Sequence, residues 1–262
     1  MSGTKPVPVV ADGIVSAVEQ PRPRAESRLS FPTLASDVSL ARVAGALYLV
    51  IIVCGVGSEA LVRGPAVVAS DAARTVQNLI SAVTAFRLSI LSDVVMVLCD
   101  VALAVLLFIL FRPVDKILSL AAATFRLVQA AVLALNLLNL HHAIELATQL
   151  ELGATRQAWV VHYLHAHAFG YDLGLFFFGV NCLATAALII RSGWFSVPLG
   201  LLVGAAALVY LTGSTLHVVT PQLSAAFAPA YVVPLIAEVA FCAALLFRRA
   251  PFPAPQEQQA TR

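Results

Sequence analysis

The sequence predicts an all-α fold, namely a polytopic membrane protein built as a bundle of six transmembrane helices. Hydrophobic residues make up 60% of the 262-residue chain and charged residues only 11%, whereas soluble domains are about 45–50% apolar and 25% charged. The mean hydropathy is +0.90. The apolar residues gather in runs near the roughly 20 residues that a helix needs to cross about 30 Å of hydrocarbon.

Six such runs follow one another along the chain, and we expect each to form one helix. They cover residues 40–62, 85–111, 117–141, 164–190, 197–218 and 230–247. The sixth run is the shortest, but a short helix can span when the bilayer thins or when flanking side chains reach the interface. The sequence lacks the alternating segments of about ten residues that are typical of membrane β-barrels.

The two ends of the chain have a different composition from the six runs. Residues 1–38 are polar and rich in proline, and residues 250–262 combine proline with glutamine. Such compositions are typical of disordered tails. We therefore divide the chain into a disordered tail over 1–38, a six-helix transmembrane domain over 39–249 and a second disordered tail over 250–262.

The segment between the first two runs allows two interpretations. Ser70 can cap a helix, and Val76, Leu79, Ile80 and Val83 follow at helical spacing. This segment is therefore either a short helix on the membrane surface or an ordered loop.

Lysine and arginine in the loops predict the orientation, because cytoplasmic loops carry an excess of both. One side of the predicted membrane holds eleven of them, including those in both tails, and the other side holds three, namely Arg63, Arg74 and Arg156. Both termini are therefore expected in the cytoplasm.

Several features exclude other kinds of function or leave them without support. The net charge of +2 is too small to indicate nucleic-acid binding. The cysteines lie inside apolar runs without a CxxC pair, which favours buried apolar side chains over a metal or disulfide framework. Glycine pairs at Gly170/Gly174 and Gly200/Gly204 favour close helix packing within the chain and leave a homo-oligomer open.

Charged residues inside the apolar runs are the most informative feature for function. Each costs about 2.5–3.5 kcal/mol at a helix centre on insertion scales, so each is expected to face the bundle interior and find a partner. The candidate binding residues are Arg87, Asp93, Asp100, Arg126, Asp172 and Glu238.

The depths of these residues predict two polar levels. Asp100, Arg126 and Glu238 lie about nine or ten residues from the cytoplasmic ends of their helices, so we expect one network near mid-membrane. Asp93 and Asp172 share a second level, with Arg87 as the candidate cation for it. Four acids then face two arginines, which requires protonated acids, a histidine or a cationic ligand. A neutral network that only fixes helix packing is the alternative.

A second cluster of polar residues lies near the non-cytoplasmic ends of the third and fourth runs. His142 and Glu145 are three residues apart, as are His162 and His165. Imidazole and carboxylate groups at such spacing can hold a divalent metal. No strong zinc motif such as HExxH is present, and histidines that only line the membrane interface are the alternative.

Several stretches resemble a bacterial membrane family known as domain of unknown function family 4386. They are Ala41–Gly45, Phe86–Ile90 with Asp93, Leu110–Val114, Phe125–Leu127 and His167–Gly174. The resemblance covers about residues 40–248. It implies a polytopic helical protein of the bacterial inner membrane. The family brings no established activity, so no catalytic residue follows from the resemblance.

These observations predict a multi-pass protein of the bacterial inner (plasma) membrane that binds or moves a small solute or protons through buried Asp, Glu and Arg side chains. Its expected partners are the lipid bilayer and that solute, with no nucleic acid and no catalytic residue. We predict no cofactor, although a divalent metal stays open. The alternatives are a metal-dependent membrane enzyme that uses the His/Glu cluster and a structural or partner subunit without chemistry, and the sequence favours a protein that is not an enzyme.

Overall fold

A computed structural model describes residues 3, 37–68, 71–149 and 153–249. The two predicted tails therefore lie outside the described residues, except at Gly3 and at Asp37 and Val38, which belong to the first helix. Within the described part there is no strand, and six helical spans are long and apolar enough to cross a membrane. The prediction of a six-helix, all-α membrane protein is thus confirmed.

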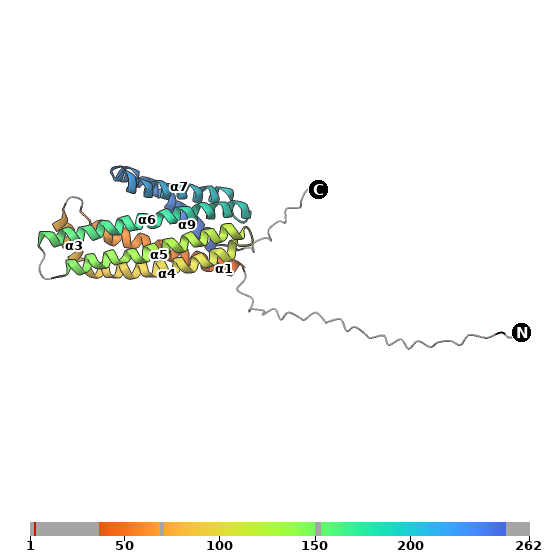
Figure 1. Ribbon diagram of the computed structural model, residues 1–262, viewed down its shortest axis with the longest axis horizontal. Coiled ribbons are helices and arrows are strands. Elements are labelled where there is room, and N and C mark those ends of the chain that lie inside the picture. Colours follow the sequence, from red (N-terminus) through yellow and green to blue (C-terminus); the bar gives the residue numbers. More distant parts are fainter. Residues whose placement is uncertain (1–2, 4–36, 69–70, 150–152, 250–262) are drawn as a thin grey trace. The chain divides into compact units, whose positions relative to one another are not determined.

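The helices follow the chain in a simple order (Figure 1). The elements are α1 Asp37–Ser58, η1 Glu59–Arg63, α2 Gly64–Ala66, α3 Ala72–Ser81, α4 Val83–Phe111, α5 Lys116–Ala147, α6 Ala154–Ser192, α7 Val197–Val219, η2 Pro221–Leu223, α8 Ser224–Phe227, η3 Ala228–Tyr231 and α9 Val232–Leu246. The element η1 is a π-helical turn, whereas η2 and η3 are 3₁₀ turns.

The largest difference from the predicted boundaries is in α6. The apolar run suggested a start near residue 164, but the helix begins at Ala154 and has 39 residues. Its length is therefore about 58 Å, which is well beyond the thickness of the hydrocarbon. The additional turns carry polar side chains such as Arg156 and Gln157. A hydropathy pattern identifies only the apolar part of a helix. It gives no signal for polar turns that extend the same helix beyond the lipid.

The last span is broken by prolines. Pro221, Pro229 and Pro234 lie in it, and short turns η2, α8 and η3 precede α9. Proline cannot donate a backbone hydrogen bond, so continuous α-helix is unfavourable there. As a result α9 has only 15 residues, or about 22 Å of helix.

Of the two interpretations left open for the segment before the second span, the short helix is present as α3. The side chain of Asp71 caps it by accepting a hydrogen bond of 2.8 Å from the backbone N–H of Arg74. The predicted cap, Ser70, lies outside the described residues. The apolar side of α3 buries Val76 and Leu79 in a cluster with α5 and α6 residues such as Leu140 and Val160. Residues 72–81 therefore form a short helix and not an ordered loop.

The long helices form a ring, because contacts run from α1 to α4, α5, α6, α7 and α9, and α9 also contacts α1. We call the end where α1 begins and α9 finishes the terminal end, and the opposite end the α3 end (Figure 1). The α1–α9 seam is tight near the terminal end. There the thiol of Cys242 donates to the Gly45 carbonyl at 3.3 Å, and a Cβ on Gly45 would lie 2.6 Å from the backbone nitrogen of Leu246.

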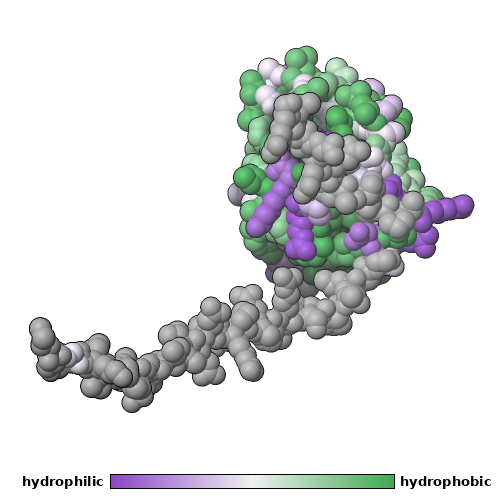
Figure 2. Space-filling model, turned by 90° about the vertical axis from the view of Figure 1, so that its right-hand side faces the viewer, coloured by the Kyte–Doolittle hydropathy of each residue, from purple (hydrophilic) through white to green (hydrophobic). Residues whose placement is uncertain are grey.

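The outer surface of the helices is suited to lipid. Large apolar side chains such as Leu98, Leu135, Leu201 and Leu208 are exposed around the ring. Figure 2, which looks onto the terminal end, shows hydrophobic residues around the described part and hydrophilic residues gathered near this end. Exposed Arg42, Arg112 and Arg191 belong to this end of the bundle. This distribution of polarity is the one expected of a helix bundle in a bilayer.

Two apolar clusters are buried inside the bundle. One includes Tyr48, Phe111, Phe178 and Phe241 and packs α1, α4, α6 and α9 together. The other lies at the α3 end and includes Phe86 with its neighbours on α3, α5 and α6. Charged residues of the spans, among them Asp100, Arg126 and Glu238, also lie inside the ring, where they line a cavity.

Candidate functional site

A cavity of about 670 Å³ lies inside the ring, and all six long helices α1, α4, α5, α6, α7 and α9 contribute to its wall. Its lining extends from Asp100 and Arg126 in the middle of the bundle to Glu59, Gly64 and Val67 near the α3 end. Asp100 is 17 residues into α4, about 26 Å from the start of that helix. The cavity therefore reaches deep into the membrane-spanning part of the protein.

Arg126 and Asp100 form an ion pair at the deep end of the cavity. Arg126 Nε donates a hydrogen bond of 2.7 Å to Asp100 Oδ1, and Nη2 lies 2.5 Å from the same oxygen, without the alignment of a second hydrogen bond. Both residues are only 3% exposed. The guanidinium also lies 5.2 Å from the ring centre of Tyr48 and 5.1 Å from that of Phe178. Aromatic faces attract a cation in this position, so the arginine is held from three sides.

Two further acceptors lie close to this pair along the cavity wall. Gln129 is one turn after Arg126 on α5 and 6% exposed, and its Oε1 has no hydrogen-bond partner among the described residues. Glu238 on α9 accepts a short hydrogen bond from the hydroxyl of Tyr210 on α7. Both side chains line the cavity, so both offer free acceptor capacity to an occupant.

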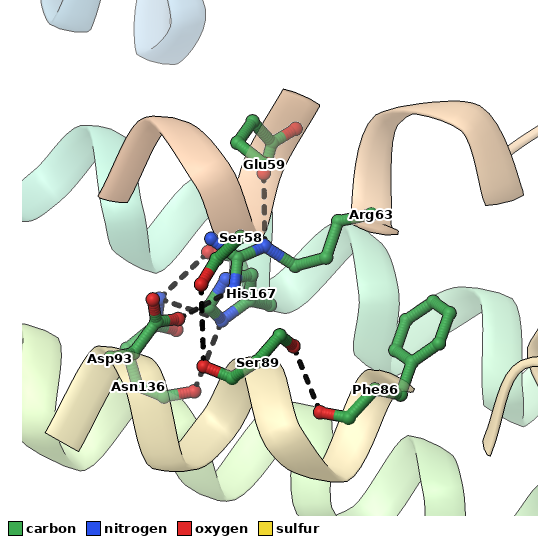
Figure 3. Close-up of polar contacts among 8 residues, drawn as sticks. All are labelled: Ser58, Glu59, Arg63, Phe86, Ser89, Asp93, Asn136 and His167. Carbon is green, nitrogen blue, oxygen red and sulfur yellow. Dashed lines mark hydrogen bonds and ion pairs between the residues drawn. The ribbon is translucent and has the colours of Figure 1, made fainter. Parts of the chain in front are cut away.

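Arg63 forms a second charged cluster nearer the α3 end (Figure 3). Its Nη1 lies 2.5 Å from Asp93 Oδ2, and its Nε donates to Glu59 Oε2 at 2.9 Å. Arg63 is 5% exposed and Asp93 1%. The hydroxyl of Ser58 on the preceding turn donates to the Ser89 carbonyl at 3.4 Å and joins α1 to α4 beside this pair.

The π-helical turn η1 explains how Arg63 reaches Asp93. One residue is added per turn in η1 compared with α-helix, which rotates the residues that follow. Glu59 and Arg63 begin and end this turn, and Figure 3 shows the Arg63 side chain lying between Glu59 and Asp93. Turns of this kind are frequent at functional sites.

The remaining deep acid, Asp172 on α6, pairs with a histidine. His217 Nδ1 on α7 makes a short contact with Asp172 Oδ2. Asp172 lines the central cavity and a smaller one of about 160 Å³, to which His217 and Tyr231 also contribute.

The structure brings together most, but not all, of the six residues singled out from the sequence. Asp100, Arg126, Asp172 and Glu238 line the central cavity. Asp93 is buried behind Arg63. Arg87 lies on the exposed face of α4, away from the cavity, and makes no hydrogen bond or ion pair with the described residues. The cation expected from Arg87 is therefore supplied by Arg63.

Arg63 is the residue that the sequence analysis missed. Because Arg63 follows the end of the first apolar run, the hydropathy pattern places it in a loop. The overlooked signal is the Glu59–Arg63 spacing of four residues, which places the two charges on one side of a continuing helix. With it, five acids (Glu59, Asp93, Asp100, Asp172 and Glu238) and two arginines line or border the cavity.

The four residues considered for a metal site do not come together as one group. His142 Nδ1 lies 3.8 Å from Glu145 Oε2, whereas His162 contacts the rings of Trp159 and Tyr163. His165 lines the cavity. In the described ranges no group of three or more His, Cys, Asp or Glu side chains is placed to hold a metal ion. The metal remains a prediction from the sequence.

Comparison with known proteins places the chain in a family. Residues 43–248 match the family described as a domain of unknown function, DUF4386. The chain belongs to the DUF4386 family. The resemblance found in the sequence is thereby confirmed, and this DUF4386 protein is an integral membrane protein whose family description states no activity.

A relative of this DUF4386 protein is found in an archaeon. The chain is similar to a protein of Archaeoglobus fulgidus that bears the name "Uncharacterized protein", with 29% identity over 123 residues. The match covers 47% of this chain and 63% of the relative, so the chain spans less than two thirds of the length of that relative. No solved structure matches the chain.

Proposed function

We propose that this DUF4386 protein binds a small solute in its central cavity and moves that solute, or protons, across the membrane. The observation that carries the proposal is the cavity of about 670 Å³ inside a ring of six spans, with charged side chains on its wall. Ligand sites are typically cavities of about 300–1,000 Å³ with a few convergent polar groups. Charged residues inside membrane spans commonly mark solute and ion pathways.

The position of Arg126 supports movement as well as binding. Arg126 lines the large cavity and also a void of about 10 Å³ toward the terminal end. That void has Ser119, Asn181 and Thr185 in its wall. Arg126 thus borders both the large hollow that reaches the α3 end and a small void whose wall is mostly apolar. In this proposal, a movement of the Arg126 side chain opens the cavity toward the terminal end.

Water access to the cavity can be tested with two single-cysteine variants on α4. Met96 lines the cavity, whereas Leu98 lies outside it and is 65% exposed on the outer surface. Both are about 20 Å or more from the start of α4. In a background in which the four native cysteines are replaced, the Met96→Cys variant should react with a charged, membrane-impermeant thiol reagent in lipid vesicles. The matched Leu98→Cys control should stay unmodified. An unreactive thiol in both variants would contradict a solute cavity.

The proposal includes an orientation and a location. Both termini lie in the cytoplasm, because the loops and tails on their side of the membrane carry most of the lysines and arginines of the sequence. The membrane is the bacterial inner membrane, as the family resemblance implies. A fluorescent protein that folds only in the cytoplasm should fluoresce when fused after Arg262, and a phosphatase active only outside should be inactive there. An active phosphatase fusion would reverse the orientation.

A further inference from the structure

The acidic side chains around the cavity outnumber the arginines, so the arginines pair with only some of these acids. Arg63 forms ion pairs with Asp93 and Glu59, and Arg126 forms one with Asp100, although its Nη2 has no hydrogen-bond partner among the described residues. Neither arginine forms an ion pair with Glu238 or Asp172 in the described part of the chain. Asp172 has His217, whereas Glu238 has the Tyr210 hydroxyl as its hydrogen-bond partner among the described residues.

Two side chains of the wall, Glu238 and Gln129, offer hydrogen-bond acceptors, and they lie beside one free donor, the Nη2 of Arg126. A carboxylate can accept about four hydrogen bonds, and Glu238 uses one of them. The Gln129 Oε1 is a second acceptor, buried and without a partner in the described part of the chain. Both oxygens attract an occupant that carries positive charge, and such an occupant can also donate hydrogen bonds to them if it has N–H groups, whereas the Glu238 carboxylate repels an anion.

Aromatic rings line the part of the cavity wall next to Glu238, and they also favour a cation. Phe178, Tyr210 and Tyr231 line the cavity in a row, with ring centres 5.3 Å apart for Phe178–Tyr210 and 6.0 Å apart for Tyr210–Tyr231. Phe178 already holds the guanidinium of Arg126 against its ring. The faces of such rings attract organic cations, and the attraction grows when the cation loses water.

The side of the cavity formed by α1 is apolar. Ile51, Ile52 and Val56 line it, together with Leu235 on α9. This wall offers little to a hydrated inorganic ion, but it can bury the hydrocarbon part of a larger ligand at about 25 cal/mol per Å².

We propose that the ligand of this cavity is a lipophilic organic cation, with its charge beside Glu238 and the Phe178–Tyr210–Tyr231 row and its apolar groups against α1. This inference rests on the proposed function, because it names the class of solute that the cavity takes. Gln129 supplies a further acceptor at the deep end.

The test compares two probes of nearly the same shape and opposite charge. Tetraphenylphosphonium and tetraphenylborate are added separately to the purified full-length protein in lipid nanodiscs, and binding is measured by equilibrium dialysis against empty nanodiscs. We expect saturable binding of tetraphenylphosphonium that exceeds that of tetraphenylborate. Glu238→Gln should weaken it by about tenfold or more. Asp37→Asn, an exposed acid at the start of α1, is the matched control and should bind like the parent.

The outcomes separate this inference from the proposed function. Preferential binding of tetraphenylborate, or unchanged phosphonium binding by folded Glu238→Gln, overturns the cationic ligand and leaves the cavity proposal standing if the Met96→Cys variant reacts with the thiol reagent. Absence of binding together with an unreactive Met96→Cys variant overturns both. If Glu238→Gln does not fold, the comparison of the two probes on the parent protein still decides the sign of the ligand charge.

Discussion

Replacing Arg126 with glutamine is expected to lower the free energy of unfolding by about 3–5 kcal/mol, the usual cost of removing one partner of a buried ion pair. The reason is that Asp100, itself 3% exposed, would lose its cation while staying inside the bundle. The loss of the guanidinium would also remove the contacts with the Tyr48 and Phe178 rings. Equilibrium unfolding of the detergent-solubilised protein measures the change.

A double variant separates packing from function. Asp100→Asn with Arg126→Gln leaves two neutral amides that can bond to each other, so most of the lost stability should return. If the pair only fixed helix packing, this variant would bind and move solute like the parent. The proposed function expects a folded protein with defective solute binding or movement. An Arg126→Gln single variant as stable as the parent would show that the ion pair has no structural role.

Replacing Arg63 with glutamine should have an effect of the same order, about 3–5 kcal/mol, because it leaves Asp93 buried without its partner. Arg87→Gln is the matched control. Arg87 lies on the exposed face of α4, and such surface changes are usually within about 0.5 kcal/mol. The two variants make the same chemical change, and both arginines lie toward the α3 end. Thermal unfolding of the two purified variants compares them.

The comparison between Arg63 and Arg87 tests the assignment of the Asp93 partner. If Arg87→Gln were the more destabilising variant, the sequence-based pairing of Arg87 with Asp93 would be right and the Arg63 cluster wrong. Equal losses in both variants would mean that Asp93 depends on neither arginine alone.

The number and order of the spans could be predicted because hydropathy reports directly on transfer into lipid. The ends of the helices could not. The first span continues through Glu59 and Arg63, where two charges neutralise each other inside a π-helical turn. The added turns of α6 lie outside its apolar run, so hydropathy carries no signal for them. The local sequence shows that a charged residue is present. The free-energy cost of burying that charge depends on a partner residue, which another turn or another helix supplies.

The level of Asp100 and Arg126 was predictable from counting residues along two helices, and these residues are indeed hydrogen-bonded. The side of α4 on which Arg87 lies could not be predicted from the sequence. A helix that is apolar on all sides gives no hydrophobic face from which a direction could be read, and the rotation of α4 is set by its contacts with α1 and α5. The pairing of Asp172 with His217 likewise depends on how α6 and α7 are rotated in the ring.

The closure of the ring by α9 against α1 has a consequence for biosynthesis. Neighbouring spans from α1 to α7 meet in the order in which a ribosome delivers them, but the α1–α9 seam joins the first span to the last. The nascent protein therefore holds Arg126 and Asp100 in an unsealed bundle until Phe241 and Cys242 reach Tyr48 and Gly45. No connecting loop of the described chain joins the two helices of that seam, so non-covalent contacts such as that of Cys242 with the Gly45 carbonyl keep the ring shut.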